Sequence, residues 1–176
     1  MACPPHRYGQ LVLHPNDETI VRFYDDFARL DGATMAGYYA PDAHFEDPVF
    51  TDLDGDEPGA MWRMLTGRAT DLAVRLESHQ ADDAQGSAHW LADYTFSTGR
   101  RVHNDVRATF RFDDEGRIAV HRDDFDLYAW TRQALGPAGV LLGWTPVLQG
   151  KVRRQARAQL DDFSRAASRD RSARWG

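Results

Sequence analysis

Residues 38–48 read YYAPDAHFEDP and combine three structural signals within a short space. The aromatic pair at positions 38 and 39 ends a helix, and the Ala40–Asp42 segment turns the chain. A short strand is expected at about residues 43–49, with Asp47 directly before Pro48, whose ring restricts Asp47 to extended backbone. The sequence therefore predicts one carboxylate at the inner end of a strand, facing the hollow between a sheet and helices.

Apolar residues at helical spacing predict three helices, two before this strand and one after it. The first is capped by Asn16 or Asp17, the second follows Asp31, and the third begins at Pro58, which suits a first helical turn. Their apolar residues are Ile20, Phe23, Tyr24, Phe27 and Leu30 in the first helix, Met35, Tyr38 and Tyr39 in the second, and Met61, Trp62 and Leu65 in the third.

Beyond Gly67 the apolar period changes to two, which predicts strands. The alternating segments are 72–76, 90–96, 102–112 and 118–128, and DDEG at 113–116 forms the turn before the last of them. Strands joined by short turns form an antiparallel meander. The predicted fold class is therefore α+β, a cone-shaped, curved antiparallel sheet packed on N-terminal helices and enclosing a pocket.

The C-terminal part is predicted to add a helical extension. A break at Gly136–Pro137 precedes a last helix that is capped by Thr145 and begins at Pro146. Its apolar stripe consists of Leu148, Val152, Ala156, Leu160 and Phe163. The chain thus divides into an irregular lead-in at 1–15, a domain at 16–130, a helical extension at 131–167 and a flexible tail at 168–176.

Composition narrows the class of protein. With 176 residues, 42% hydrophobic and 27% charged, the chain has the composition of one globular domain rather than of a disordered protein. No apolar run approaches the roughly 20 residues of a membrane helix. No signal peptide is recognisable and the single cysteine, Cys3, excludes an internal disulfide, so a cytoplasmic location is expected. Twenty arginines against one lysine fit a GC-rich bacterial genome.

The net charge of -6 is unevenly distributed. From Lys151 onward there are eight basic and three acidic residues, a net charge of +5, which leaves -11 on residues 1–150. Such an acidic body argues against nucleic-acid binding, which needs basic side chains to neutralise phosphates. The basic C-terminal segment is interpreted as a solvated helix face, with an anionic partner as the alternative.

The three helices, the D-A-x-F-x-D-P strand at 42–48 and the meander with its D-E-G-R-I turn at 114–118 resemble the nuclear transport factor 2-like superfamily. The pattern is most similar to ketosteroid isomerases and SnoaL-like polyketide cyclases. The resemblance covers about residues 16–130 and implies a cone of sheet and helices around one pocket. Because the superfamily also contains dehydratases, epoxide hydrolases and non-catalytic members, it leaves the function open.

The resemblance places Asp47 at the proton-shuttling aspartate of the isomerases. The tyrosine of the isomerase oxyanion hole falls on Phe23, and the second oxyanion donor, a protonated aspartate, falls on Ala108. Neither residue can donate a hydrogen bond from its side chain. Since oxyanion stabilisation is usually the largest catalytic contribution, orthodox ketosteroid isomerase activity is not expected.

Asp47, His121 and Asp123 are the candidate catalytic residues. A carboxylate that faces aromatic side chains has a raised pKa, which suits a general base near neutral pH. Alternation places His121, Asp123 and Phe125 on one face of the last strand, and the resemblance turns that face into the pocket. The alternatives are an aspartate that only bonds neighbouring backbone and a histidine–aspartate pair that only satisfies the core.

A wall of aromatic and apolar side chains is expected to line the pocket, which suits an apolar or aromatic small molecule. Tyr94 and Asn104 are the expected hydrogen-bonding anchors, and an ordinary packed core is the alternative. The predicted lining residues are Phe23, Tyr39, Trp62, Trp90, Tyr94, Asn104, Val106, Ala108, Phe110 and Phe125.

No metal or cofactor is predicted. The series Asp52, Asp54, Asp56 is similar to the start of a calcium loop, but Glu57 and Arg63 stand where that loop requires Gly and Glu. The sequence contains no phosphate loop, dinucleotide fingerprint or nucleophile elbow.

The favoured function is a small-molecule pocket protein of the SnoaL-like kind that catalyses proton transfer on an apolar carbonyl compound, as an isomerase, cyclase or dehydratase. A non-catalytic ligand-binding or assembly module of the same fold is the alternative. A homodimer is expected, because outward positions carry both charge signs and a two-fold axis would pair them. These positions are His103, Asp105, Arg107 and Arg111.

Overall fold

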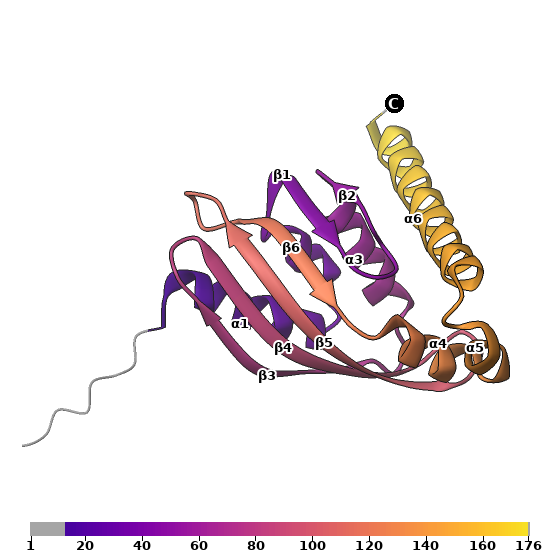
Figure 1. Ribbon diagram of the computed structural model, residues 1–176. Coiled ribbons are helices and arrows are strands. Elements are labelled where there is room, and N and C mark those ends of the chain that lie inside the picture. The colour runs from indigo at the N-terminus through magenta and orange to yellow at the C-terminus, as the bar shows by residue number, and fades with distance from the viewer. Residues whose placement is uncertain (1–12, 176) are drawn as a thin grey trace, which may run out of the picture.

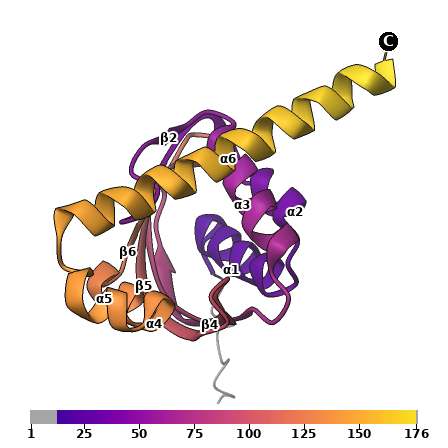
Figure 2. The same ribbon diagram turned by 90° about the vertical axis from the view of Figure 1, so that its right-hand side faces the viewer.

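A six-stranded curved sheet, in the order β2-β1-β6-β5-β4-β3, organises the fold. The computed structural model describes residues 13–175. The strands are β1 Tyr39–Glu46, β2 Leu53–Asp54, β3 Ala73–Ala81, β4 Gln85–Thr95, β5 Arg101–Phe112 and β6 Ile118–Asp124. The helices are α1 Pro15–Ala28, α2 Gly32–Ala36, α3 Glu57–Arg68, α4 Leu127–Leu135, α5 Pro137–Leu142 and α6 Pro146–Trp175. Helices α1–α3 cover one face of the sheet (Figures 1 and 2). The predicted α+β class is confirmed.

Helix α1 begins slightly earlier in the sequence than predicted. The Nδ1 atom of His14 accepts a hydrogen bond from the Asn16 backbone N–H at 3.2 Å, so His14 is the cap rather than Asn16 or Asp17. Pro15 then occupies the first helical position, where a backbone N–H is not needed. Asp17 instead pairs with His79 of β3 at 2.6 Å and ties the helix to the sheet.

Strands β3–β6 form the predicted antiparallel meander. The turn before β6 is closed by a hydrogen bond from the Gly116 N–H to the Asp113 carbonyl, with Gly116 at a φ of +74°. One pairing differs from the expected all-antiparallel sheet, since β1 lies parallel to β6, with Phe45 opposite His121. The chain reaches this arrangement because α3 and four strands intervene between the two partners.

The core fills the space between the sheet and α1–α3. Phe23 of α1 is fully buried, and its ring centroid lies 5.5 Å from Trp62 of α3 and 5.6 Å from His121 of β6. The even-numbered residues of β5 face the same interior, where Val106 and Phe110 are buried. The inner face of the sheet is therefore in contact with aromatic side chains from every covering helix except the short α2.

The sheet ends in a helical C-terminal part. Strand β6 stops before residue 128, where the sequence predicted its end, because the Asp126 carboxylate accepts the Ala129 N–H and starts α4. Thr145 and Pro146 begin α6 as predicted, with the Thr145 hydroxyl accepting the Leu148 N–H at 3.3 Å. No helix in the described part of the chain is long and apolar enough to span a membrane.

Helix α6 leaves the α5 corner, crosses α3 and the β1–β2 connection, and then projects beyond the body (Figure 2). Among its side chains up to residue 169, Leu160 is the one that is fully buried, and the rest of the predicted stripe is half-buried. The helix continues to Trp175, through the segment 168–176 that was expected to be a flexible tail. The division of the chain into lead-in, domain, extension and tail stays a prediction. Most of the lead-in, with Cys3, lies outside the described residues.

Candidate functional site

A chain of buried hydrogen bonds connects α3, β1 and β6. The Trp62 indole donates to the Tyr39 hydroxyl at 2.7 Å, and that hydroxyl lies 2.7 Å from Nδ1 of His121. On its other side His121 contacts Oδ1 of Asp123 through Nε2, at 3.1 Å. All four side chains are buried. Because a carboxylate only accepts, a neutral His121 carries its N–H on Nε2 toward Asp123, and Nδ1 then accepts the Tyr39 proton.

Two more aromatic side chains surround the carboxylate of Asp123. The Trp90 indole of β4 donates to Oδ1 at 3.4 Å. Tyr24 of α1 lies beside Trp90, with its ring centroid 5.6 Å away, but its buried hydroxyl makes no hydrogen bond of good geometry within the described residues. Burial, with the Asp123 charge as the second cause, raises the pKa of Tyr24 well above its usual value. Tyr24 therefore keeps a proton that it can donate.

Asp47 follows β1 directly and lies at the edge of this network. Its Oδ1 atom accepts hydrogen bonds from the N–H groups of Val49 and Phe50 at 2.6 and 2.5 Å. Bonding to neighbouring backbone is the alternative role that the sequence analysis considered for this aspartate. Burial, with a smaller contribution from the Asp123 charge, raises the pKa of Asp47 to about 7 against the opposing effect of these two hydrogen bonds. The two carboxylates thus act on each other, and Asp47 titrates near neutral pH.

Arg153 of α6 contributes a positive charge that the sequence did not point to. Its Nε atom donates to the Pro48 carbonyl at 2.9 Å, and its charge lowers the pKa of the neighbouring Asp47. The side chain comes from a helix more than a hundred residues along the chain, in a segment interpreted as a solvated basic face. No local pattern in the sequence distinguishes Arg153 from the other arginines of that helix.

The predicted lining residues fall into two groups. Tyr94, Asn104 and Phe125 are half-buried, whereas the other seven belong to the packed core. The Tyr94 hydroxyl accepts the Trp130 indole N–H at 2.7 Å. Burial raises the pKa of Tyr94, and the Asp47 charge adds to this effect. The seven core residues pack against one another, and the lining role of all ten residues stays a prediction.

Two hollows lie on the surface of the described chain, and neither is lined by Asp47, His121 or Asp123. The larger, of about 840 Å³, is lined mainly by outward side chains of β4–β6 such as Thr109. The smaller, of about 320 Å³, lies between residues 49–53 and α6 and includes Arg153, Arg154 and Arg157. This second hollow adjoins Asp47, because Val49 and Phe50 belong to its wall. The enclosed pocket between Asp47 and β6 stays a prediction.

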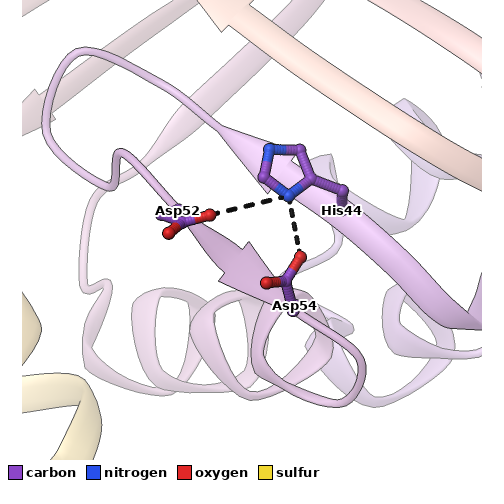
Figure 3. Close-up of side chains that lie close together, drawn as sticks. All are labelled: His44, Asp52 and Asp54. Carbon is purple, nitrogen blue, oxygen red and sulfur yellow. Dashed lines mark hydrogen bonds and ion pairs between the residues drawn. The ribbon is translucent and has the colours of Figure 1, made fainter.

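A separate cluster lies on the outward face of β1. His44, Asp52 and Asp54 converge there, and their ligand atoms all lie within 4.8 Å of one another (Figure 3). The cluster is the one group of metal-type ligands found among residues 13–175.

Comparison with known proteins gives a family and a shared fold. The family model described as the SnoaL-like domain matches residues 20–121. One similar solved structure is that of an M. tuberculosis LEH-like epoxide hydrolase, with 23% sequence identity and a TM-score of 0.58. The match covers 72% of this chain and 94% of that one. No curated protein matches the chain. At this identity the solved structure shows a common fold.

Proposed function

The chain belongs to the SnoaL-like domain family, and on that basis we propose that it binds an apolar or aromatic small molecule and catalyses proton transfer on it. The family and the α+β fold support a small-molecule pocket protein. The observation that carries the catalytic part is the pKa of Asp47, raised to about 7 beside a second carboxylate. A base of that pKa is close to half-ionised at neutral pH, where general base catalysis is most effective.

Asp47 is the proposed base. His121 holds the second carboxylate, that of Asp123, in place. Tyr39 in turn fixes the imidazole of His121 in one tautomer. The hydroxyl of Tyr24 is the proposed donor to a developing oxyanion, since it is buried, protonated and without a hydrogen bond of good geometry in the described chain. Phe23 lacks such a donor, but the next residue supplies one to the same interior.

The substrate class follows from this arrangement. A base with neighbouring hydroxyl donors can take a proton next to a carbonyl group, which is the step shared by isomerases, cyclases and dehydratases. The same base can activate water for attack on an epoxide, the reaction named for the M. tuberculosis structure. Aromatic surroundings favour an apolar compound in either case.

The direct test measures turnover of cyclic ketones, lactones, polyketide-like aromatic compounds and apolar epoxides. We expect Asp47→Asn to lower the rate by roughly 10²–10⁴-fold, the usual contribution of a general base. Asp162→Asn is the matched control, because Asp162 is an exposed aspartate on α6 that pairs with Arg165. Equal turnover by the wild type and Asp47→Asn would remove Asp47 from the mechanism.

A non-catalytic binding or assembly module is the second candidate. It is favoured by the close packing of most predicted lining residues and by the absence of Asp47 from the walls of both hollows. Native mass spectrometry of the purified protein separates the two functions. A copurifying molecule that the wild type binds but leaves unconverted would favour the binding module.

We also propose that the protein forms a homodimer. The outward side chains of β5, namely His103, Asp105, Arg107 and Arg111, are exposed and carry both charge signs. Two of them are paired within the chain, His103 with Asp93 and Asp105 with His89. Arg107 and Arg111, which alternate with them, form no ion pair within the described part of the chain and are available to a second copy.

A further inference from the structure

The cluster on the outward face of β1 is created by strand register. His44 lies directly opposite Asp54 in the antiparallel β1–β2 pair. Asp52 stands two residues before Asp54 and therefore points to the same side, since side chains alternate along extended chain. All three side chains converge on one point in space (Figure 3).

The distances lie within about half an ångström of those around a shared ion. Nδ1 of His44 lies 2.8 Å from Oδ1 of Asp54 and 3.8 Å from Oδ1 of Asp52. A metal with ligand bonds of about 2.1 Å holds neighbouring ligand atoms roughly 3.0–3.4 Å apart, whether tetrahedral or octahedral. Small side-chain rotations would bring the three atoms to those separations.

The charges of the cluster also call for a cation. Asp52 and Asp54 both pair with His44, and within the described part of the chain they form no other ion pair. Two carboxylates this close repel each other unless a positive charge lies between them. Glu57 adds a further negative group nearby, with Oε2 accepting the Asp54 N–H at 3.3 Å, although Arg157 pairs with it.

We propose that His44, Asp52 and Asp54 bind a divalent transition-metal ion of the Zn²⁺ type. An imidazole combined with carboxylates favours such ions, whereas Ca²⁺ and Mg²⁺ take oxygen ligands. The side chains of Asp52 and Asp54 are 76% and 73% exposed, so the ion can enter from solvent. Three protein ligands leave coordination positions for water or for a donor from another molecule.

The proposed ion would join β1 to the start of β2 across the connection that carries Asp47. The segment between them, residues 47–52, supplies both the backbone N–H groups that bind Asp47 and one wall of the smaller hollow. Binding would therefore stabilise the folded chain, because the three ligands are brought together only in the native structure.

Isothermal titration of the full chain with ZnCl₂, with any affinity tag removed, tests the proposal. We expect one equivalent of Zn²⁺ to bind to the wild type, and His44→Gln and Asp54→Asn to weaken binding at least tenfold. His103→Gln is the matched control: His103 lies 2.9 Å from Asp93, so it forms the same kind of pair but without a third ligand. This control should bind Zn²⁺ like the wild type.

Thermal unfolding with and without Zn²⁺ provides a second readout. The ion should raise the melting temperature of the wild type and of His103→Gln but not that of His44→Gln. If Asp54→Asn fails to fold, Asp52→Asn takes its place, since Asp52 is exposed and outside the strands. Absence of binding by the wild type, or undiminished binding by His44→Gln, would overturn the proposal.

Discussion

The Asp47→Asn substitution is expected to stabilise the protein, and to do so more as the pH rises. Burial holds the pKa of Asp47 at about 7 in the folded chain, against an ordinary value of 3.8. The folded state therefore keeps a proton that the unfolded state releases, and the free energy of unfolding falls as the pH rises from about 4 to about 7. An asparagine keeps the oxygen that accepts the Val49 and Phe50 N–H groups but never carries the charge.

The expected magnitude follows from the shift of about 3 pKa units, each worth about 1.36 kcal/mol. Ionised Asp47 thus lowers the free energy of unfolding by up to about 4 kcal/mol above pH 7, and not at all below about pH 4, where both states are protonated. The advantage of Asp47→Asn over the wild type should grow by that amount across the interval. If Asp47 is also the base, the stabler variant is the inactive one.

Urea unfolding followed by tryptophan fluorescence, repeated from about pH 4 to about pH 8, measures this difference. Asp162→Asn serves again as control, because its side chain is 74% exposed. A difference between wild type and Asp47→Asn that does not change with pH would refute a half-buried carboxylate whose pKa lies near neutral pH. A difference that grows toward acid would show that the native structure favours the charged form.

Further outcomes follow from packing and assembly. Tyr39→Phe removes the central hydroxyl of the buried chain and should cost about 1–3 kcal/mol of unfolding free energy; an unchanged urea midpoint would contradict this. Leu160→Ala should cost about 2–4 kcal/mol, and a loss below about 1 kcal/mol would show that α6 does not pack on the core. Gly139→Ala places a Cβ 1.9 Å from the Thr131 carbonyl and should cost about 1–3 kcal/mol, whereas Gly67→Ala meets nothing within 4 Å. Light scattering at tens of micromolar should report a dimer, and a monomer would refute that proposal.

The elements that the sequence predicted are those with strong local signals. Period-two alternation placed His121 and Asp123 on one face of the last strand, and the family resemblance turned that face inward; both side chains are buried. The Asp47-Pro48 pair indicated a carboxylate where a strand ends, and β1 ends one residue before it. Such features depend on spacing between near neighbours, which the sequence displays directly.

The remaining features depend on contacts between distant segments. Arg153 reaches the Pro48 carbonyl, next to Asp47, only because α6 crosses the β1–β2 connection. Asp52 and Asp54 were weighed as part of a contiguous calcium loop, but their third partner, His44, comes from the neighbouring strand. A register between two short strands leaves no trace in the spacing of residues along one of them.

The parallel pairing of β1 with β6 has a consequence for the order in which the protein is made. During synthesis β1 emerges long before β6, and until β6 follows, one of its edges has no partner. Contacts of such sequence separation form slowly, because a long loop must close before they are gained. The pairing of β1 with β6, which brings Asp47 near Asp123, is therefore among the last contacts to form on the ribosome-bound or refolding chain. Recovery of the neutral-pH titration of Asp47 would mark the end of folding, after the meander and its helices are already in place.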